Sequence, residues 1–521
     1  MQSRTLQALP YLFFVALLPT MILRDFTPSN ELRYLSIADE AIENGDIFTF
    51  SNHGIPYADK PPLYLWIVML GRWLFGAHAM WFLSLFSFLP AVVIIRTMNR
   101  WVERVTTPAE RVTATLMLMS CGLFLGLSIF VRMDMLMNMF ITLAIYTFYR
   151  IYSGEINARR GQTLFGVWIF LALFTKGPVG FLVPLVSTVA FFVCSRKFRT
   201  IGRYWGWRTW AVLLTGCALW WGGVLAEDGV EYLRNLLFHQ TFDRAVDAFH
   251  HKEPFYYYLI SLWYSMAPWS LLVVVAIAAG VWRCLFWSDL ERLFFAVILS
   301  TLVMLSAFSS KIAVYLSPIF PFFIYLGTLA CVKLRRRGYL TVCVALPAAI
   351  WTVAVPTLAV VAHRPGLEWL NVGCFYCAAV ILTLSGVVAL AQLFRFRRTL
   401  RPAINSLAAG LLAAIFVGGF ALPKINARLG YGELCRRALE MADEVGVDRF
   451  YAWRMSRPEN MDVYLGCDVQ KITSAELLDG GCRDGVVLLP ISRLGKDADM
   501  LEFVSGLERD SVGGYLIALP R

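Results

Sequence analysis

Long apolar segments separated by short polar connections run through the first 422 residues of the chain. Most of these segments are roughly 20 residues long, the length of α-helix that crosses the hydrocarbon core of a bilayer. The pattern predicts about thirteen membrane spans. They are expected near residues 9–25, 78–97, 112–128, 134–152, 163–175, 178–194, 209–226, 257–282, 292–309, 312–332, 339–361, 370–393 and 403–421.

Alternate connections between these spans are rich in lysine and arginine. Basic connections face the cytoplasm in membrane proteins, so the N-terminus is expected inside. The outer connections are then a first loop at 26–62, a large loop at 227–256 and the C-terminal tail. The basic connections contain Arg96, Arg100, Arg104 and Arg111; Arg150, Arg159 and Arg160; Arg196, Lys197, Arg199 and Arg203; Arg283 and Arg292; Lys333, Arg335, Arg336 and Arg337; and Arg395, Arg397, Arg398 and Arg401.

The chain changes character after residue 422, where apolar runs become too short to cross a membrane. Helical spacing over 424–445 and short strand-like runs at 450–453, 485–489 and 515–519 predict a small α/β domain. This domain, residues 423–521, is expected outside the membrane, after a transmembrane domain at 1–422.

The composition supports a membrane class. Hydrophobic residues make up 58% of the sequence and charged residues 16%, with a mean hydropathy of +0.61. A soluble domain is nearer half apolar and a quarter charged, and a β-barrel would show ten-residue segments of alternating polarity. The fold class is therefore an all-α polytopic membrane protein. Its net charge of +11 lies mainly on the basic connections, so no nucleic acid partner is expected.

Two acidic sites lie at the expected outer face. One is Asn30-Glu31, in a polar interval that follows the first span, and the other is Asp134 beside Arg132 at the start of a span. Charges at span ends often extend toward the interface without a further role. A pair of acidic sites on one face favours function, because a carboxylate can accept a proton from an attacking hydroxyl or orient it.

Several basic residues also lie at the outer face, against the positive-inside trend. An anionic lipid headgroup is one reason for them, since ammonium and guanidinium groups bind phosphate and stabilise it as a leaving group. Anchoring to ordinary phospholipids is the alternative for each one alone. Tyr34, Tyr57 and Tyr315 are weaker candidates for the same site, because interfacial tyrosines are common. The basic residues are Lys60, Lys176, Arg244 and Lys311.

A metal site is left open. His53 and His239 lie in outer loops and could ligate a metal together with Asp59. Cys374 and Cys377 form a CxxC, but it lies within an apolar span, where helix packing is the simpler explanation.

The order of these motifs resembles bacterial GT-C glycosyltransferases, namely the lipid-A 4-amino-4-deoxy-L-arabinose transferases and their protein O-mannosyltransferase-like relatives. The resemblance covers about the first 330 residues, and it rests on the ordered set because each motif alone is weak. The matching elements are NELRY (30–34), GD (45–46), YADKPP (57–62), RMD (132–134), TKGP (175–178), Arg244, EPFYYY (253–258) and SSKIAVYLSP (309–318).

The resemblance implies an enzyme of the bacterial inner membrane that takes a sugar from a polyprenyl-phosphate donor, such as an undecaprenyl phosphate sugar. Transfer would take place at the periplasmic face, to lipid A, another glycolipid or a protein, with or without a divalent metal. Carried onto matching positions, Glu31 and Asp134 lie at the reaction centre with Asn30. The implied donor phosphate and lipid residues are Arg33, Tyr34, Tyr57, Lys60, Arg244, Lys311 and Tyr315, and the metal candidates are Asp59 and His239.

The chain departs from the family pattern at Asn30, where the family usually has Asp. An amide cannot take a proton, so a base function would fall to Glu31, to Asp134 or to the acceptor. A phosphate acceptor is already ionised near neutral pH, and Asn30 therefore favours a phosphate over a hydroxyl acceptor. Three alternatives remain: a protein O-glycosyltransferase, a transporter or flippase of lipid-linked sugars, and a catalytically inactive scaffold, which Asn30 slightly favours. A transporter is less favoured, because no repeat relates the two halves and the mid-span regions are nearly free of charge.

Overall fold

The computed structural model describes residues 2–237, 253–286, 288–335 and 337–519, which fall into two compact units. The first, here called the helical unit, comprises Met1–Pro19, Ala58–Tyr64 and Ser84–Gly419. The second, here called the sheet unit, comprises Thr20–Tyr57, Leu65–Leu83 and Phe420–Arg521. Arg244 and His239 lie outside the described residues.

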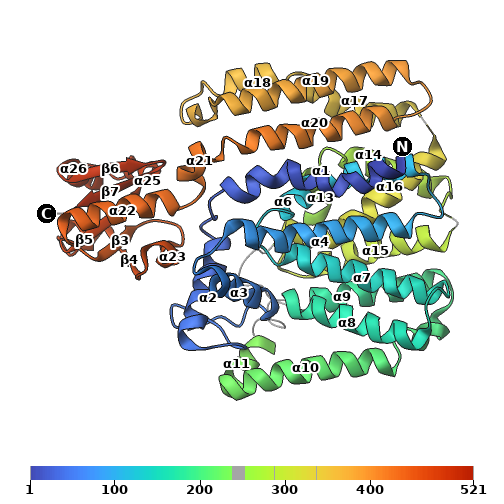
Figure 1. Ribbon diagram of the computed structural model, residues 1–521, viewed down its shortest axis with the longest axis horizontal. Coiled ribbons are helices and arrows are strands. Elements are labelled where there is room, and N and C mark those ends of the chain that lie inside the picture. The colour runs from blue at the N-terminus through green and yellow to red at the C-terminus, as the bar shows by residue number, and fades with distance from the viewer. Residues whose placement is uncertain (1, 238–252, 287, 336, 520–521) are drawn as a thin grey trace. The chain divides into compact units, whose positions relative to one another are not determined.

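The helical unit consists of long helices that lie side by side (Figure 1). Pairs that are adjacent in sequence, such as α7 with α8 and α19 with α20, also pack on each other. The helices are α1 (Gln2–Leu23), α4 (Met80–Trp101), α5 (Pro108–Met119), α6 (Gly122–Leu127), α7 (Asp134–Tyr152), α8 (Ala158–Lys176), α9 (Val179–Cys194), η1 (Phe198–Arg203), α10 (Trp207–Glu227), α11 (Gly229–Arg234), α13 (Tyr257–Ser265), α14 (Ser270–Trp282), α15 (Asp289–Ala307), η3 (Ala313–Ile319), α16 (Phe320–Leu334), α17 (Gly338–Thr352), α18 (Ala354–Val361), η4 (Glu368–Leu370), α19 (Gly373–Arg395) and α20 (Arg401–Gly419).

Seven helices in the described part of the chain are long and apolar enough to cross a membrane. An eighth span results if α17 and α18, which meet at a bend of 46°, are counted as one. Other expected spans consist of shorter pieces, because the chain breaks at 120–121 between α5 and α6 and at 266–269 between α13 and α14. The chain is thus a helical multi-span protein, and the number thirteen stays a prediction.

The two breaks lie against each other. The indole Nε1 of Trp269 donates a hydrogen bond to Ser120 Oγ at 2.9 Å, and the backbone N–H of Gly122 donates to Ala267 O at 2.8 Å. A Cβ at Gly122 would come within 3.2 Å of that carbonyl oxygen. Non-helical backbone in a membrane needs such internal partners, since lipid offers none.

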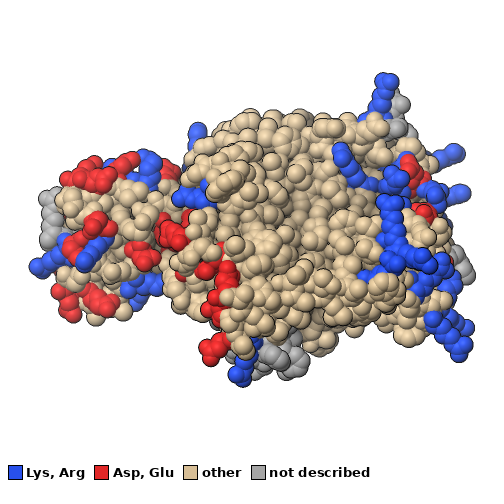
Figure 2. All heavy atoms as spheres, turned by 60° about the horizontal axis from the view of Figure 1, so that its bottom comes forward, with Lys and Arg blue, Asp and Glu red and all other residues tan. Residues whose placement is uncertain are grey.

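The arginine-rich connections meet at one end of the helical unit (Figure 2). Arg104 forms an ion pair with Glu155 at 2.9 Å, and Lys333 forms one with Glu291 at 2.5 Å. Lys197 donates to the hydroxyl of Tyr152 at 2.5 Å. These contacts join neighbouring connections across the end of the unit. The basic connections that alternate along the sequence therefore lie together at one end of the helical unit.

The sheet unit contains a five-stranded sheet in the order β4-β3-β5-β7-β6. β3 pairs parallel with β4 and β5, whereas β7 pairs antiparallel with β5 and β6. β5 is buried along its whole length, and Trp453 and Leu489 belong to the core cluster on one face. The strands are β3 (Arg449–Trp453), β4 (Val469–Ile472), β5 (Gly485–Pro490), β6 (Glu508–Val512) and β7 (Tyr515–Leu519).

The same unit includes the first polar loop of the sequence, which forms a helix and a two-stranded hairpin. The apolar side of α2 is buried, with Leu32, Leu35 and Ile37 fully enclosed. Besides the five strands, the elements of the sheet unit are α2 (Glu31–Asn44), β1 (Ser51–Asn52), β2 (Ile55–Pro56), α3 (Leu63–Phe75), α21 (Leu422–Leu429), α22 (Gly432–Val445), η5 (Pro458–Met461), α23 (Asp462–Leu465), α24 (Ser474–Leu478), α25 (Ile491–Leu494) and α26 (Ala498–Ser505).

Candidate active site

A buried cluster of charges lies at the end of the helical unit opposite the arginine-rich connections. α7 begins at Asp134 and α8 ends at Lys176, so the two helices present these side chains at the same end. Lys176 Nζ donates to Asp134 Oδ1, and Arg132 Nε donates to Asp134 Oδ2 at 3.0 Å. Both carboxylate oxygens are therefore bound by a cation.

This cluster carries an excess of positive charge. The side chain of Asp134 is 1% exposed and that of Lys176 is 7% exposed, so water screens the two charges weakly. One carboxylate faces two cations, which leaves a net charge of +1 among the three side chains. Lys176 Nζ also lies 4.8 Å from the ring centroid of Tyr315 in η3. A cluster with net positive charge suits an anionic group.

Lys311 lies in the segment between α15 and η3, four residues before Tyr315. Its ammonium donates to the backbone oxygens of Glu253, at 2.9 Å, and Phe308, and the residue is 4% exposed. The contacts show a lysine that holds two chain segments together. The place of Lys311 along a lipid pocket stays a prediction.

Lys60 and Asp59 belong to the short segment Ala58–Tyr64 of the helical unit. Lys60 Nζ donates to the backbone oxygen of Asp59 at 3.1 Å and lies 4.0 Å from its carboxylate. Both side chains are mostly buried, at 18% and 17% exposure.

In the sheet unit, Glu31 forms the first residue of α2 and is buried in a bidentate ion pair. Arg24 donates from Nη1 to Oε2 at 2.5 Å and from Nη2 to Oε1 at 2.7 Å. The backbone N–H and the hydroxyl of Thr27 donate to Oε2 at 2.8 and 2.9 Å. Glu31 is 1% exposed. Its carboxylate thus fixes the turn from residue 24 to α2.

The neighbouring predicted residues also come together within the sheet unit. The guanidinium carbon of Arg33 lies 5.9 Å from the ring centroid of Tyr34 and 5.6 Å from that of Tyr57. Arg33 Nη2 also donates to Asn30 Oδ1 at 3.5 Å, a long contact. These distances are within the range of cation–π attraction. The arrangement holds one cation beside Asn30, and the donor-binding role of these residues stays a prediction.

Asp25, which the sequence did not single out, joins the first loop to the C-terminal part of the sheet unit. Its carboxylate accepts hydrogen bonds from Tyr464 Oη at 2.5 Å, Gly432 N at 2.8 Å and Phe26 N at 2.7 Å. A Cβ at Gly430 would overlap Asp25 Oδ2. Burial raises the pKa of the Tyr464 phenol, and the adjacent Asp25 raises it further, so Tyr464 stays a donor.

The described residues contain no group of three His, Cys, Asp or Glu side chains that could hold a metal ion. His53 lies in the sheet unit, where its ring faces Asp468 at 3.1 Å and Asp462 at 3.6 Å. Burial raises the pKa of Asp462, while the hydroxyl of Ser36 and His53 oppose that rise. His239 is not described, so the expected pairing of Asp59 with His239 stays a prediction.

The partners of both buried carboxylates were detectable in part. Arg132 lies two residues before Asp134 in the sequence, and this short spacing indicated that the two side chains could pair. Arg24 was missed, although it carries the same signal that identified Lys60, a positive charge at the outer end of a span. Asp25 gives no such signal, because its partners Gly432 and Tyr464 lie 407 and 439 residues further along the chain.

Comparison with known proteins finds similar sequences and folds. A family model described as dolichyl-phosphate-mannose-protein mannosyltransferase matches residues 59–221. The chain also superimposes on the crystal structure of ArnT from Cupriavidus metallidurans in the apo state, with a TM-score of 0.74 and 17% identity over 98% of this chain and 95% of that one. For ArnT bound to undecaprenyl phosphate the TM-score is 0.77, with 17% identity over 99% and 97%. The chain therefore has the fold of ArnT, and part of its sequence is similar to this mannosyltransferase family.

The curated relatives are named undecaprenyl phosphate-alpha-4-amino-4-deoxy-L-arabinose arabinosyl transferases. The protein of Edwardsiella ictaluri is 26% identical over 54% of this chain and 50% of its own length. The protein of Pseudomonas fluorescens is 24% identical over 82% and 77%. The chain spans only about half the length of the first relatives it matches. The resemblance to the arabinose transferases that the motifs indicated is confirmed.

Proposed function

We propose that this protein is a glycosyltransferase that moves a sugar from an undecaprenyl-phosphate-linked donor to lipid A or a similar envelope glycolipid. We further propose that it works in the bacterial inner membrane with its active site at the periplasmic face. The relatives are named for the use of such a donor, and ArnT was crystallised with undecaprenyl phosphate. The family resemblance favours an enzyme over a transporter.

The observation that carries this proposal is the buried, net-positive cluster of Asp134, Lys176 and Arg132. When the sugar leaves its donor, the bond between the anomeric carbon and the phosphate oxygen breaks, and its electron pair stays on the phosphate. Cations placed beforehand in a poorly solvated site stabilise that developing charge. Lys176 and Arg132 are such cations, and Asp134 keeps them in position.

The second part of the argument concerns the acceptor. Both oxygens of Glu31 are bound by Arg24, and Asn30 has an amide in place of a carboxylate. Neither side chain is well suited to take a proton from a hydroxyl. A phosphate oxygen on lipid A is already ionised and attacks the anomeric carbon without a base. We therefore assign Glu31 a positioning role and favour a phosphate acceptor.

The remaining predicted residues keep their proposed roles at the donor. Lys60 and Arg244 would bind its phosphate, Arg33 with Tyr34 and Tyr57 would contact the donor, and Lys311 and Tyr315 would line the lipid pocket. The described residues contain no group of three His, Cys, Asp or Glu side chains, and the roles proposed here belong to the side chains named above.

The proposal can be tested with the full-length protein in proteoliposomes that contain a radiolabelled undecaprenyl-phosphate sugar. Transfer to lipid A is expected, together with little transfer to lipid A from which the phosphates have been removed. Substitution Asn30→Asp gives a second test. A large gain in rate on a hydroxyl acceptor in this variant would count against the phosphate-acceptor argument.

The description of the matching family favours one competing function, a protein O-glycosyltransferase. Its acceptor would be a serine or threonine hydroxyl, which needs a base more than a phosphate does. The same proteoliposomes, offered a secreted polypeptide rich in serine and threonine, distinguish the two functions. Label on the polypeptide and none on lipid A would favour the protein acceptor.

A further inference from the structure

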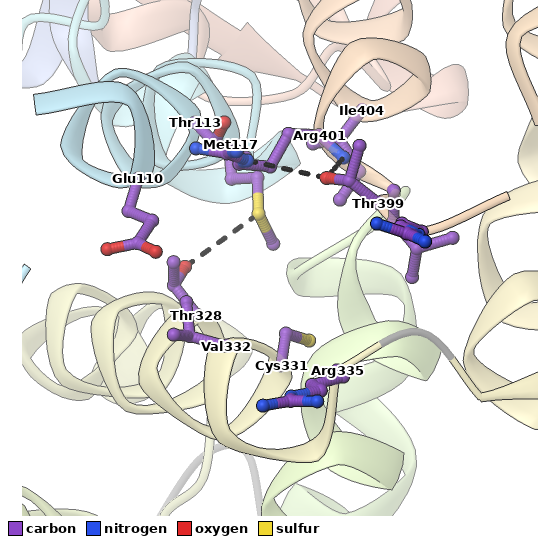
Figure 3. A pocket seen from close by; sticks show the side chains of 12 residues that line it. Glu110, Thr113, Met117, Thr328, Cys331, Val332, Arg335, Thr399, Arg401 and Ile404 are labelled. Carbon is purple, nitrogen blue, oxygen red and sulfur yellow. Dashed lines mark hydrogen bonds between the residues drawn. The ribbon is translucent and has the colours of Figure 1, made fainter. Parts of the chain in front are cut away.

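A pocket of about 190 Å³ opens at the arginine-rich end of the helical unit, at the opposite end from the Asp134 cluster. It lies where α5 begins, α16 ends and α20 begins, which are three helices brought together from distant parts of the sequence. Figure 3 shows side chains from all three helices around it, with Glu110 and Met117 from α5 and Cys331 and Arg335 from the end of α16.

The lining of this pocket is net positive. Arg335, Arg398 and Arg401 contribute three guanidinium groups, and Glu110 contributes one carboxylate. Glu110 already accepts the backbone N–H of Thr107 at 2.8 Å in the N-terminal cap of α5. Within the described part of the chain, none of the three arginines forms an ion pair, although Arg401 Nε donates to Thr399 Oγ1 at 3.3 Å. Guanidinium groups bind phosphate oxygens in a planar, two-pronged geometry.

The rest of the lining is a mixture of hydroxyl and apolar groups. Thr113, Thr328 and Thr399 supply hydroxyls, while Met117, Leu400 and Ile404 supply hydrocarbon surface. A site with cations at the helix ends and apolar residues further along the helices matches a molecule that has both a phosphate and hydrocarbon chains. A soluble phosphate would leave the apolar part of the lining unused.

The backbone of Arg335, one of the three arginines, has an unusual conformation. This residue has φ 56° and ψ −170°, a conformation that is essentially confined to glycine. A residue other than glycine keeps such a conformation only where the surrounding structure determines it. Arg335 has this conformation at the point where α16 ends, and its side chain lines the pocket.

We propose that this pocket binds the phosphate of an anionic phospholipid headgroup, with the acyl chains lying along the apolar wall. Basic pockets between transmembrane helices at the cytoplasmic side bind anionic headgroups in this manner. The site is separate from the proposed sugar transfer, because it lies at the other end of the helical unit. Its occupant is a constituent of the membrane rather than a donor or an acceptor.

The test uses the purified full-length protein and native mass spectrometry, with phosphatidylglycerol titrated in detergent and phosphatidylcholine as the neutral reference. The pocket variant combines Arg335→Gln, Arg398→Gln and Arg401→Gln. The matched control combines Arg159→Gln, Arg160→Gln and Arg199→Gln, which removes the same charge from exposed arginines of the same end. We expect phosphatidylglycerol to bind at least fivefold more weakly to the pocket variant and less than twofold more weakly to the control.

A second variant, Cys331→Phe, fills the pocket without removing any arginine, and we expect it to weaken phosphatidylglycerol binding as well. If the triple variant does not fold, Cys331→Phe alone tests whether the pocket binds phosphatidylglycerol. Equal weakening in the pocket and control variants, or unchanged binding in Cys331→Phe, would overturn the proposal. Displacement of the lipid by an equal concentration of inorganic phosphate would also overturn it, because the site would then recognise free phosphate.

Discussion

Asp134 and Glu31 are both buried carboxylates whose two oxygens are each bound by a cation. A carboxylate in this state is a poor proton acceptor, but it holds its cations in a fixed place. Under the proposed function, the residues that act directly on the donor are expected to be the cations. This view of single residues leads to two predictions, because removal of a carboxylate and removal of its cation have different effects on the local charge.

In the Asp134 cluster, substitution Lys176→Met leaves a balanced pair of Asp134 and Arg132, whereas Asp134→Asn leaves two buried cations without their counter-ion. Loss of one partner of a buried ion pair costs about 3–5 kcal/mol, so Asp134→Asn should lower the thermal stability markedly. Lys176→Met should remain close to wild type in stability and lose about 100-fold in kcat, the typical effect of removing one stabilising donor.

Melting curves and transfer rates in the same detergent measure both effects for the Lys176 and Asp134 variants. Gln162→Met, at the opposite end of α8, serves as a control for a change to methionine on that helix. If Lys176→Met transferred sugar at the wild-type rate, the role of this cation at the leaving phosphate would be wrong.

For Glu31 we predict coupling to Arg24. Each of Arg24→Gln and Glu31→Gln leaves one partner of a buried pair unbalanced, whereas the double variant leaves neither charge. The double variant should therefore be less destabilised than the sum of the single variants, by about 1–3 kcal/mol. A double-mutant cycle in chemical denaturation gives this number. Full additivity, together with complete inactivity of Glu31→Gln alone, would favour a base over an anchor.

The sequence identified both carboxylates because charged residues are conspicuous beside apolar spans. It also gave Lys176, for the same reason. It could not show that Lys176 binds Asp134, because the pairing depends on which helix ends become neighbours in the fold. The local pattern is also silent about Asp25, whose partners Gly432 and Tyr464 are remote in sequence.

At the scale of elements, strands with apolar residues were predictable and polar strands were not. The expected strands at 450–453, 485–489 and 515–519 correspond to β3, β5 and β7. β6 reads ERDSV and has no buried residue, so its pairing with β7 alone makes it a strand. β4 is an edge strand with two exposed residues. The helix expected over 424–445 is divided at Gly430, where Asp25 approaches the chain.

That approach gives a prediction for Gly430. Substitution Gly430→Ala places a methyl group on Asp25 Oδ2 and disrupts the contacts of this carboxylate with Gly432 and Tyr464. Overpacking of this kind costs about 1–3 kcal/mol. Differential scanning fluorimetry should show a lower melting temperature. In contrast, Gly495→Ala should be silent, since Gly495 has φ −64° and open space around it. Equal stability of both variants would contradict the importance of the Asp25 contacts.

At the scale of the whole molecule, the sequence predicted a helical membrane protein with a basic end, and the helical unit has both features. The number of spans could not be fixed, because a hydropathy window averages over breaks such as those at 120–121 and 266–269. Only the hydrogen bonds of Ser120 with Trp269 and of Gly122 with Ala267 show how these breaks are accommodated.

The predicted orientation can be checked by labelling single cysteines in a background from which the exposed Cys194, Cys284 and Cys377 have been removed. Arg199→Cys lies at the basic end, and Asp228→Cys lies at the opposite end, after α10. By the positive-inside bias, a membrane-impermeant maleimide added to intact spheroplasts should label Asp228→Cys and leave Arg199→Cys unlabelled. The reverse pattern would place the Asp134 cluster at the cytoplasmic face.

The hydrogen bonds that Gly432 and Tyr464 donate to Asp25 can form only late in biosynthesis. Tyr464 follows Asp25 by 439 residues, so the ribosome has translated almost the entire message before this hydrogen bond can form. Until then, the turn that carries Arg24 and Glu31 lacks the hydrogen bond that Tyr464 donates to Asp25. A nascent chain that ends before Tyr464 could insert its helices into the bilayer and still lack this hydrogen bond. Synthesis of the last fifth of the polypeptide is therefore the step that completes the first loop.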